Sequence, residues 1–145
     1  MSLDEATIQR VSTELNSSVI CDTMDSLGYL NQAMDRHIRP LDESKTLFGP
    51  VRTALIEDVE PGTPRPDNPY ELTIKVMDDL NPGDVLVRSC ATRRVAATWG
   101  ELLTAAAMGR GAAGLVTDGQ IRDVQLIREV GSPVFTNGVS PLDGG

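Results

Sequence analysis

The order of helical and strand patterns after residue 70 limits the fold of this chain more than any other feature of its sequence. Helical patterns over 68–80, 98–108 and 123–130 alternate with short apolar runs that are typical of buried strands. These strand patterns cover residues 85–87, 113–117 and 133–136. Regular alternation of this kind favours a layered α/β domain in which some strands are parallel.

The amino-terminal half predicts two helices and a strand. A helix over 4–15 is followed by a second helix, which Asn16 caps and Gly28 ends. Both carry an apolar face at helical spacing. A strand over 49–56 comes next, and Asn68 is the predicted N-cap of the helix that follows it.

The length and charge of the chain narrow its class. Its 145 residues suffice for one ordinary domain and not for two, so a single domain over 1–145 is expected. The formal charge is −8, which argues against a nucleic-acid partner. No apolar run approaches the length of a membrane span, and no secretory signal is visible. Cys21 and Cys90 have no metal-binding spacing, as expected of a reduced protein, so the predicted location is cytoplasmic, with no membrane partner.

The charge is distributed unevenly along the chain. Residues 1–87 carry seven basic and 16 acidic side chains, a net charge of −9. Residues 88–128 carry six arginines and three acids, a net charge of +3. A small anionic ligand would therefore favour the second stretch.

The scarcity of histidine and lysine excludes several kinds of catalysis. His37 is the single histidine, so one chain cannot form a three-histidine zinc site. No nucleophile-elbow sequence lies near His37, and a loop position is the simpler interpretation. Lys45 and Lys75 are the only lysines, and both have the local sequence of solvated positions rather than of a Schiff-base site. Any chemistry must rest on carboxylates, arginines and backbone amides.

The first candidate for a binding site is the start of the helix over 98–108. The residues Thr98-Trp-Gly-Glu101 have the pattern of a capping box, in which the Thr98 and Glu101 side chains satisfy backbone N–H groups. Gly100 has no β-carbon, so a ligand could approach the first-turn amides of residues 100–103. These amides and the helix dipole favour a carboxylate. A plain helix start is the alternative, and the local pattern by itself favours it.

The second candidate is the pair Arg122 and Asp123, which follows the strand over 113–117. The pair lies where a strand meets the next helix, the usual ligand crevice of open α/β sheets. Twenty residues separate Glu101 from Arg122, about one helix and one strand with their turns, so both helix starts are expected at one edge. Two acids and an arginine there would suit a hard cation with oxygen ligands. The alternatives are that Asp123 only caps its helix and that Arg122 only pairs with Asp123.

Motifs along nearly the whole chain occur together in one known family. The carboxyl-terminal motifs are Trp99-Gly-Glu-Leu-Leu103, Gly114-Leu-Val-Thr-Asp-Gly-Gln-Ile-Arg-Asp123 and Gly131-Ser-Pro-Val-Phe135. The amino-terminal motifs are Asp22-Thr-Met-Asp-Ser-Leu-Gly28, Ile38-Arg-Pro-Leu41, Phe48-Gly-Pro-Val51 and Asn81-Pro-Gly-Asp-Val-Leu-Val87. The most specific of these signatures is an acid, Glu101, followed after 20 residues by Arg122-Asp123. On these motifs the chain resembles the class II 4-hydroxy-4-methyl-2-oxoglutarate aldolase family, which also contains regulators of ribonuclease activity.

The resemblance implies a fold, an assembly and a reaction. The implied fold is a layered, swivelling α/β sandwich of the phosphohistidine-domain type. The implied assembly is a homotrimer or homohexamer with active sites between subunits. The implied reaction is a metal-dependent retro-aldol cleavage of 4-hydroxy-2-oxo dicarboxylic acids to pyruvate, with oxaloacetate decarboxylation as a side activity.

The resemblance also implies roles for individual residues. The residues implied to hold the carboxylate of a 2-oxo acid substrate through their backbone amides are Gly100, Glu101, Leu102 and Leu103. By the same match, Arg122 would contact the pyruvate oxygen during catalysis. Asp123 would ligate Mg²⁺ or Mn²⁺ and take part in catalysis, with Glu101 close to the metal.

Two departures from the family pattern accompany these expectations. After the strand over 85–87 the family has an Asp-Gly-Gly-Gly or similar loop, whereas this chain has Arg88-Ser-Cys-Ala-Thr92, which alters the substrate side of the pocket. The chain also stops in a glycine-containing segment over 137–145, so a domain lacking its carboxyl-terminal portion is expected. Two other interpretations stay open: a regulator that binds and inhibits a ribonuclease, and an inactive paralogue that binds a small acid.

Overall fold

The computed structural model describes residues 4–60, 62–64, 66–90 and 95–143, which form a mixed α/β fold. The helices are α1 (Glu5–Glu14), α2 (Ser17–Ser26), α3 (Glu71–Asp78), α4 (Glu101–Gly109) and α5 (Val124–Val130). The strands are β1 (Arg39–Pro40), β2 (Val51–Ile56), β3 (Val85–Cys90), β4 (Ala97–Trp99), β5 (Gly114–Thr117), β6 (Gln120–Ile121), β7 (Val134–Thr136) and β8 (Gly138–Val139). None of the helices in these ranges is both long enough and apolar enough to cross a membrane.

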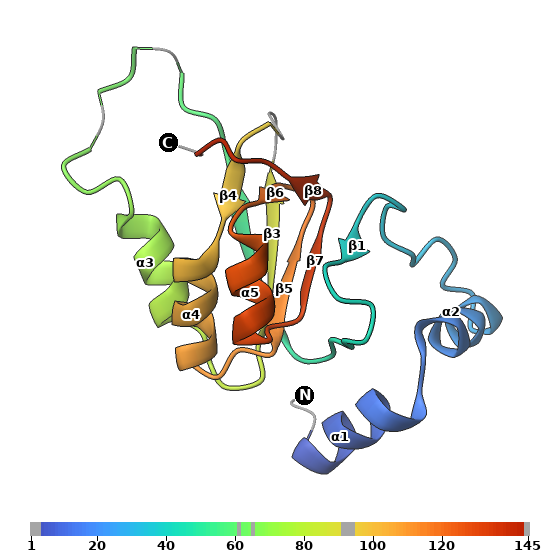
Figure 1. Cartoon of the computed structure of the whole chain (residues 1–145). Coiled ribbons are helices and arrows are strands. Elements are labelled where there is room, and N and C mark those ends of the chain that lie inside the picture. The colour runs from blue at the N-terminus through green and yellow to red at the C-terminus, as the bar shows by residue number, and fades with distance from the viewer. Residues whose placement is uncertain (1–3, 61, 65, 91–94, 144–145) are drawn as a thin grey trace.

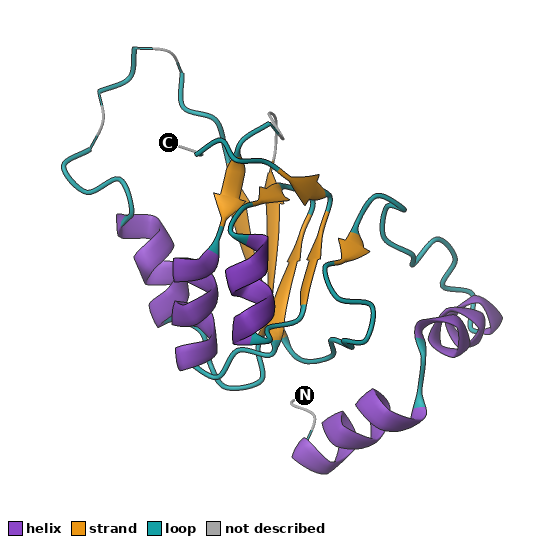
Figure 2. Ribbon diagram, in the orientation of Figure 1, coloured by secondary structure: helices purple, strands orange, loops and turns teal. Residues whose placement is uncertain are grey.

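The strands form two sheets. The larger sheet has the order β1-β7-β5-β3-β2, in which β2, β3, β5 and β7 are parallel and β1 joins antiparallel at the edge. The smaller sheet has the order β4-β6-β8, with parallel pairing throughout. Figure 2 shows these three short strands near the arrowheads of the larger sheet. The alternating order of elements therefore gives the layered α/β class that the sequence predicts.

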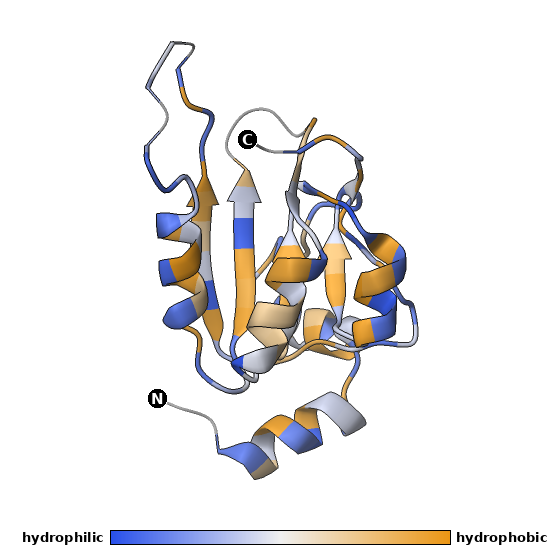
Figure 3. Ribbon diagram, turned by 60° about the vertical axis from the view of Figure 1, so that its left-hand side comes forward, coloured by the Kyte–Doolittle hydropathy of each residue, from blue (hydrophilic) through white to orange (hydrophobic). Residues whose placement is uncertain are grey.

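The core lies between the larger sheet and three helices. Helices α3, α4 and α5 lie side by side over one face of the sheet (Figure 1). In Figure 3 the sheet strands are mainly hydrophobic along their length, as expected of parallel strands covered by helices. The buried side chains that form the core are Met77, Leu80, Leu86, Trp99, Ala107, Ala112, Leu115, Ile121, Ile127 and Val134.

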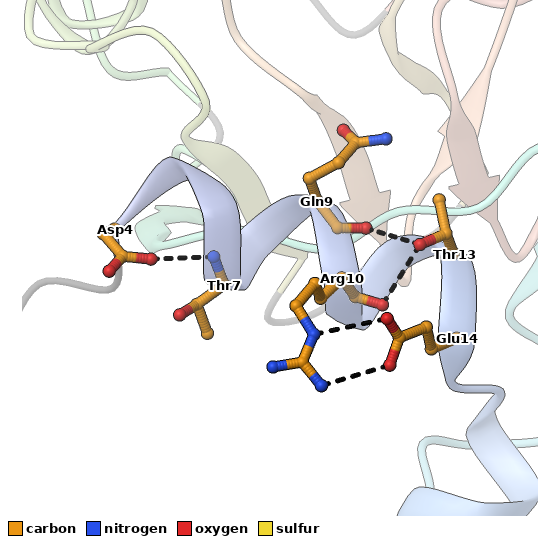
Figure 4. Close-up of polar contacts among 6 residues, drawn as sticks. All are labelled: Asp4, Thr7, Gln9, Arg10, Thr13 and Glu14. Atoms are coloured by element: carbon orange, nitrogen blue, oxygen red, sulfur yellow. Dashed lines mark hydrogen bonds and ion pairs between the residues drawn. The ribbon is translucent and has the colours of Figure 1, made fainter.

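The two amino-terminal helices lie apart from this layered body (Figure 1), and neither contains a buried residue. The polar contacts of α1 are local: the Asp4 carboxylate accepts a hydrogen bond from the Thr7 N–H at 2.7 Å, and Arg10 pairs with Glu14 (Figure 4). The apolar faces of α1 and α2 border an open groove of about 580 Å³ along the uncovered face of the larger sheet.

The structure confirms some predicted helix boundaries and corrects others. The Asn16 side chain caps α2 by accepting from the Val19 N–H at 3.0 Å, and Gly28 follows the helix with a φ of 85°. Asn68 is not the N-cap of α3, because that helix begins two residues later, after Tyr70. The Asn68 side chain instead accepts from the Tyr70 N–H at 3.1 Å, so it stabilises the turn before the helix.

Candidate functional site

Two helix starts meet at one edge of the smaller sheet. Strands β4 and β6 pair in parallel, with Trp99 opposite Ile121, and each strand leads within two residues into its helix. The Arg122 N–H extends the pairing by donating to the Trp99 carbonyl at 2.9 Å. The amino-terminal ends of α4 and α5 therefore lie next to each other, as the spacing of Glu101 and Arg122 predicts.

Helix α4 begins differently from the predicted capping box. Thr98 is part of β4. The N-cap is Gly100, whose backbone is extended and which has no side chain to cap the helix. The capping box is wrong because strand pairing with β6 holds the segment extended as far as Trp99. The first helical residue is Glu101 rather than Trp99.

Asp123 supplies the contact that a local cap would otherwise make. Its backbone is left-handed (φ 58°), and its carbonyl accepts from the Ile127 N–H at 3.0 Å to start α5. Its side chain does not cap α5. Instead, its Oδ2 accepts from the Glu101 N–H of α4 at 3.2 Å, so one carboxylate links the two helix starts.

Gly100 is required by this arrangement. A β-carbon at position 100 would lie 2.5 Å from the Asp123 Oδ2 and 3.2 Å from the Arg122 Cγ. No side chain can be accommodated there unless the carboxylate or the backbone moves. The close approach of the Arg122 and Asp123 side chains therefore explains why position 100 is a glycine.

Arg122 lies between two carboxylates. Its Nε is 3.6 Å from the Asp123 Oδ2, and its Nη1 is 3.4 Å from the Asp143 Oδ1. All three side chains are between 38% and 61% exposed, so these pairs orient the guanidinium more than they stabilise the fold. Sequence reasoning did not find Asp143. Asp143 is brought to Arg122 by a β-bridge between Ala97 and Asp143, which no local sequence pattern predicts.

An open pocket of about 410 Å³ borders the pair. Arg122 and Asp123 form its polar wall, and Val124 lies beside them at the start of α5. The opposite wall is formed by Val139, Ser140 and Pro141. The pocket therefore combines one guanidinium and one carboxylate with a largely apolar wall, a composition suited to a small organic anion.

Buried hydrogen bonds of Thr104 hold the start of α4 in place. Thr104 is fully buried, and its hydroxyl donates to the Gly100 carbonyl at 2.9 Å while accepting from the Trp99 indole N–H at 2.7 Å. Because the N-cap carbonyl also accepts from the Thr104 N–H at 3.1 Å, Gly100 is held by two bonds from one residue.

The other predicted substrate-binding residues contribute backbone rather than side chains. The Leu102 side chain is 79% exposed, and the Leu103 side chain packs against the core. Both N–H groups belong to the first turn of α4, where helix geometry provides no carbonyl partner. Glu101 is brought to Asp123 through its N–H, not through its carboxylate.

The donor set for a metal is limited. Within the described residues, no group of three or more His, Cys, Asp or Glu side chains could hold a metal ion. Asp123 and Glu101 offer carboxylate oxygens, the ligands that Mg²⁺ and Mn²⁺ prefer. Since Mg²⁺ usually keeps several waters and takes one or two protein carboxylates together with substrate oxygens, these residues fit such an ion in part.

The residues set aside by the sequence argument lie away from this site. His37 is exposed and its ring bonds to Asp35 at 2.7 Å; the His37 backbone N–H and then its ring lower the pKa of Asp35. Lys75 is exposed on α3, and Cys21 and Cys90 are both free thiols. Of the unusual segment over 88–92, residues 88–90 belong to β3, and the rest lies outside the described residues.

Comparison with known proteins adds a family to this geometry. A family model described as RraA-like, Aldolase/RraA, matches residues 17–145. A Halalkalibacterium halodurans protein named "Putative 4-hydroxy-4-methyl-2-oxoglutarate aldolase" is 31% identical over 127 residues, which cover 86% of this chain and 53% of that protein. Protein DlpA of Legionella pneumophila is 27% identical over 129 residues, covering 89% of this chain and 20% of that protein. The chain thus spans about half the length of the first relative and a fifth of the second.

A solved structure has the same arrangement of elements. Streptomyces coelicolor RraAS2 is described as an unusual member of the RNase ES inhibitor RraA protein family. It superimposes with a TM-score of 0.79 at 25% sequence identity, covering 99% of this chain and 67% of that chain.

Proposed function

Because this chain belongs to the RraA-like family, we propose that it is a divalent-metal-dependent lyase. Its substrates would be 4-hydroxy-2-oxo dicarboxylic acids of the 4-hydroxy-4-methyl-2-oxoglutarate type, cleaved to pyruvate by a retro-aldol reaction. Oxaloacetate decarboxylation would be a side activity, since it passes through the same pyruvate enolate. The name of the Halalkalibacterium halodurans relative supports the aldolase assignment.

One observation carries the proposal: Arg122 and Asp123 lie together at the open start of α4, beside a pocket of about 410 Å³. Asp123 bonds to the start of α4 rather than capping its own helix, and Gly100 leaves room for its carboxylate, so both residues depart from local capping patterns. Polar side chains that depart from local rules and converge on a pocket are typical of a functional site.

The start of α4 would bind the substrate carboxylate. The N–H groups of Leu102 and Leu103 and the positive end of the helix dipole attract an anion there. The Glu101 N–H is already occupied by Asp123, so we assign the substrate contact mainly to the amides of Gly100, Leu102 and Leu103.

Arg122 would stabilise the charge that forms in the reaction. Transfer of the 4-hydroxyl proton to a water molecule breaks the C3–C4 bond, forms a carbonyl at C4 and leaves the electron pair as the enolate of pyruvate. The guanidinium of Arg122, oriented by Asp123 and Asp143, can donate to the enolate oxygen. Protonation at C3 then completes pyruvate.

Asp123, with Glu101 nearby, would hold the divalent cation. When bound, Mg²⁺ or Mn²⁺ supplies Lewis-acid polarisation of the substrate's carboxylate and keto oxygens. Asp123 is exposed enough to reach such an ion, and its backbone position is fixed by the first turn of α5. Neither lysine lies at this site, which agrees with a metal-dependent route instead of a Schiff base.

The proposal is tested by pyruvate release from 4-hydroxy-4-methyl-2-oxoglutarate and from oxaloacetate, followed with a coupled assay. We expect turnover with Mg²⁺ or Mn²⁺ and its loss when EDTA removes the metal. Absence of turnover with both metals and both substrates would contradict the enzyme assignment. Metal-independent turnover would contradict the proposed cofactor.

The structural similarity to Streptomyces coelicolor RraAS2, a member of a ribonuclease-inhibitor family, supports a regulatory role as the competing function. A regulator of that kind needs no acid after Arg122, whereas this chain has Asp123 there. A third interpretation is an inactive paralogue that only binds a small acid. Inhibition of a ribonuclease without pyruvate release would favour the regulator, and binding of pyruvate without turnover would favour the paralogue.

We extend the proposal to the domain, assembly and location. We assign the chain to a single RraA-like domain with the swivelling sandwich arrangement, and to a homotrimer or homohexamer without nucleic-acid or membrane partners. Its free cysteines suit the cytoplasm, where thiols stay reduced. Light scattering after size-exclusion chromatography would measure the assembly, and a monomer at working concentration would contradict it.

A further inference from the structure

Arg88 is a buried arginine at the carboxyl-terminal half of β3. Only 5% of the residue is exposed, and its neighbours in the sheet are Ala54 and Thr117. Arginine is among the residues that are least often fully buried, because removing a charge from water is costly without a partner. A charged side chain at this position therefore requires an explanation.

The contacts of Arg88 point toward the start of α4. Its Nη1 donates to the Thr98 carbonyl at 2.6 Å, and its guanidinium carbon lies 5.3 Å from the centre of the Trp99 ring. No carboxylate of the described residues lies within ion-pairing distance of it. Burial lowers the pKa of this guanidinium, although arginine stays charged in proteins.

The two residues that Arg88 contacts are directly followed by Gly100. Trp99 is in turn bonded to both halves of the candidate site: its carbonyl accepts from the Arg122 N–H at 2.9 Å, and its indole N–H donates to Thr104 at 2.7 Å. Thr104 holds the Gly100 carbonyl. Arg88 is thus linked to both helix starts through the Thr98–Trp99 segment and the hydrogen bonds of Trp99.

We propose that Arg88 is a positioning residue, which fixes Thr98 and Trp99 so that the first-turn amides of α4 face the substrate carboxylate. It acts through Trp99 and Gly100 and does not touch the substrate. The inference rests on the proposed function for the identity of the ligand, and on the hydrogen bonds alone for the positioning. It also gives a role to a residue in the segment where this chain departs from the family pattern.

Arg88→Met is the informative variant, because methionine fills much of the same apolar volume but cannot bond to Thr98. We expect faster amide hydrogen exchange at Thr104 and Arg122, whose N–H groups bond to the Gly100 and Trp99 carbonyls, with unchanged exchange in β5. Pyruvate formation should show a rise in KM of roughly tenfold with a much smaller change in kcat, because misplacement of a binding group weakens substrate binding.

Arg88→Lys and Arg52→Met complete the experiment. Lysine keeps a donor and a charge, so Arg88→Lys should restore part of the exchange protection. Arg52 lies on the neighbouring strand and pairs with Asp84 at the far end of the sheet, so Arg52→Met removes an arginine without touching β4. We expect normal exchange at Thr104 and Arg122 in that control.

Unchanged exchange at Thr104 and Arg122 in a folded Arg88→Met variant would overturn the inference. A uniform increase in all core peptides, in both Arg88 variants, would also overturn it, because Arg88 would then serve general stability. If the parent protein releases no pyruvate, the proposed function fails while the exchange data still decide the role of Arg88.

Discussion

The starts of α4 and α1 show two ways of satisfying a helix terminus. Asp4 precedes α1 and accepts from the Thr7 N–H three residues later, at 2.7 Å. Helix α4 begins after Gly100, which has no side chain, and its first N–H is met by Asp123, 22 residues further along the chain. The first contact is local and stabilises only its own helix. The second joins two helices and brings an arginine and a carboxylate to the same place.

The difference shows how a binding site can be built from an incomplete helix cap. A local cap at position 100 would have covered the first turn of α4 with its own side chain. Glycine leaves that turn open, and Asp123 covers only the Glu101 N–H. The remaining first-turn amides have no carbonyl partner within the helix, so an anion can satisfy them.

The largest effect is expected from Asp123→Asn. The amide can still accept from Glu101 and tolerates a left-handed backbone, so thermal stability should stay close to that of the parent. Loss of the negative charge should lower metal-dependent kcat/KM by roughly 10³-fold, since a metal contributes several kcal/mol to such reactions. Turnover and its Mg²⁺ dependence measure this, and values equal to the parent's would show that Asp123 is only a structural link.

Gly100→Ala tests whether an open helix start is needed. The added β-carbon would lie 2.5 Å from the Asp123 Oδ2, so the carboxylate must move and kcat/KM should fall about 100-fold, as for other misplaced catalytic groups. Gly109→Ala, at the other end of α4, is the matched control because nothing lies within 4 Å of its added carbon. Equal activity of the two variants would show that the close packing at Gly100 has no catalytic consequence.

Arg122→Lys tests whether Arg122 acts through the planar geometry of its guanidinium or through its positive charge alone. Arginine can contact two carboxylates and a substrate oxygen with one planar group, whereas lysine offers a compact charge. We expect kcat/KM with oxaloacetate to fall roughly tenfold or more, by analogy with other losses of bidentate geometry. Near-normal kcat/KM would exclude a directional role for Arg122.

The smallest effect is expected from Asp143→Asn. Its pair with Arg122 is exposed, so unfolding free energy should change by less than about 1 kcal/mol. We expect kcat/KM to fall by a factor of about three, because one of the two groups that orient Arg122 is lost while Asp123 remains. A double-mutant cycle with Arg122→Lys measures the coupling, and strictly additive effects would show that Asp143 does not orient Arg122.

Several features of this protein could be predicted from local sequence. Asn16 and Gly28 mark helix ends correctly because capping and left-handed stops depend on a few adjacent residues. The alternation of helix and strand gives the layered α/β class, since each pattern reflects which side chains must be buried. The spacing also predicts that Glu101, Arg122 and Asp123 lie together, and in the structure the Asp123 carboxylate contacts both the Glu101 N–H and the Arg122 guanidinium.

Only the tertiary structure decided the details of the site. Thr98 has the sequence of a helix cap, yet pairing of β4 with β6 extends the backbone through Trp99 and moves the helix start to Glu101. The same pairing turns the Asp123 carboxylate from its own helix to a neighbouring one. The strands of the smaller sheet have only two or three residues and were not predicted, because they form where distant partners complete their hydrogen bonds. The contacts of Arg88 and Asp143 depend on the same pairing and are therefore invisible in any short stretch of sequence.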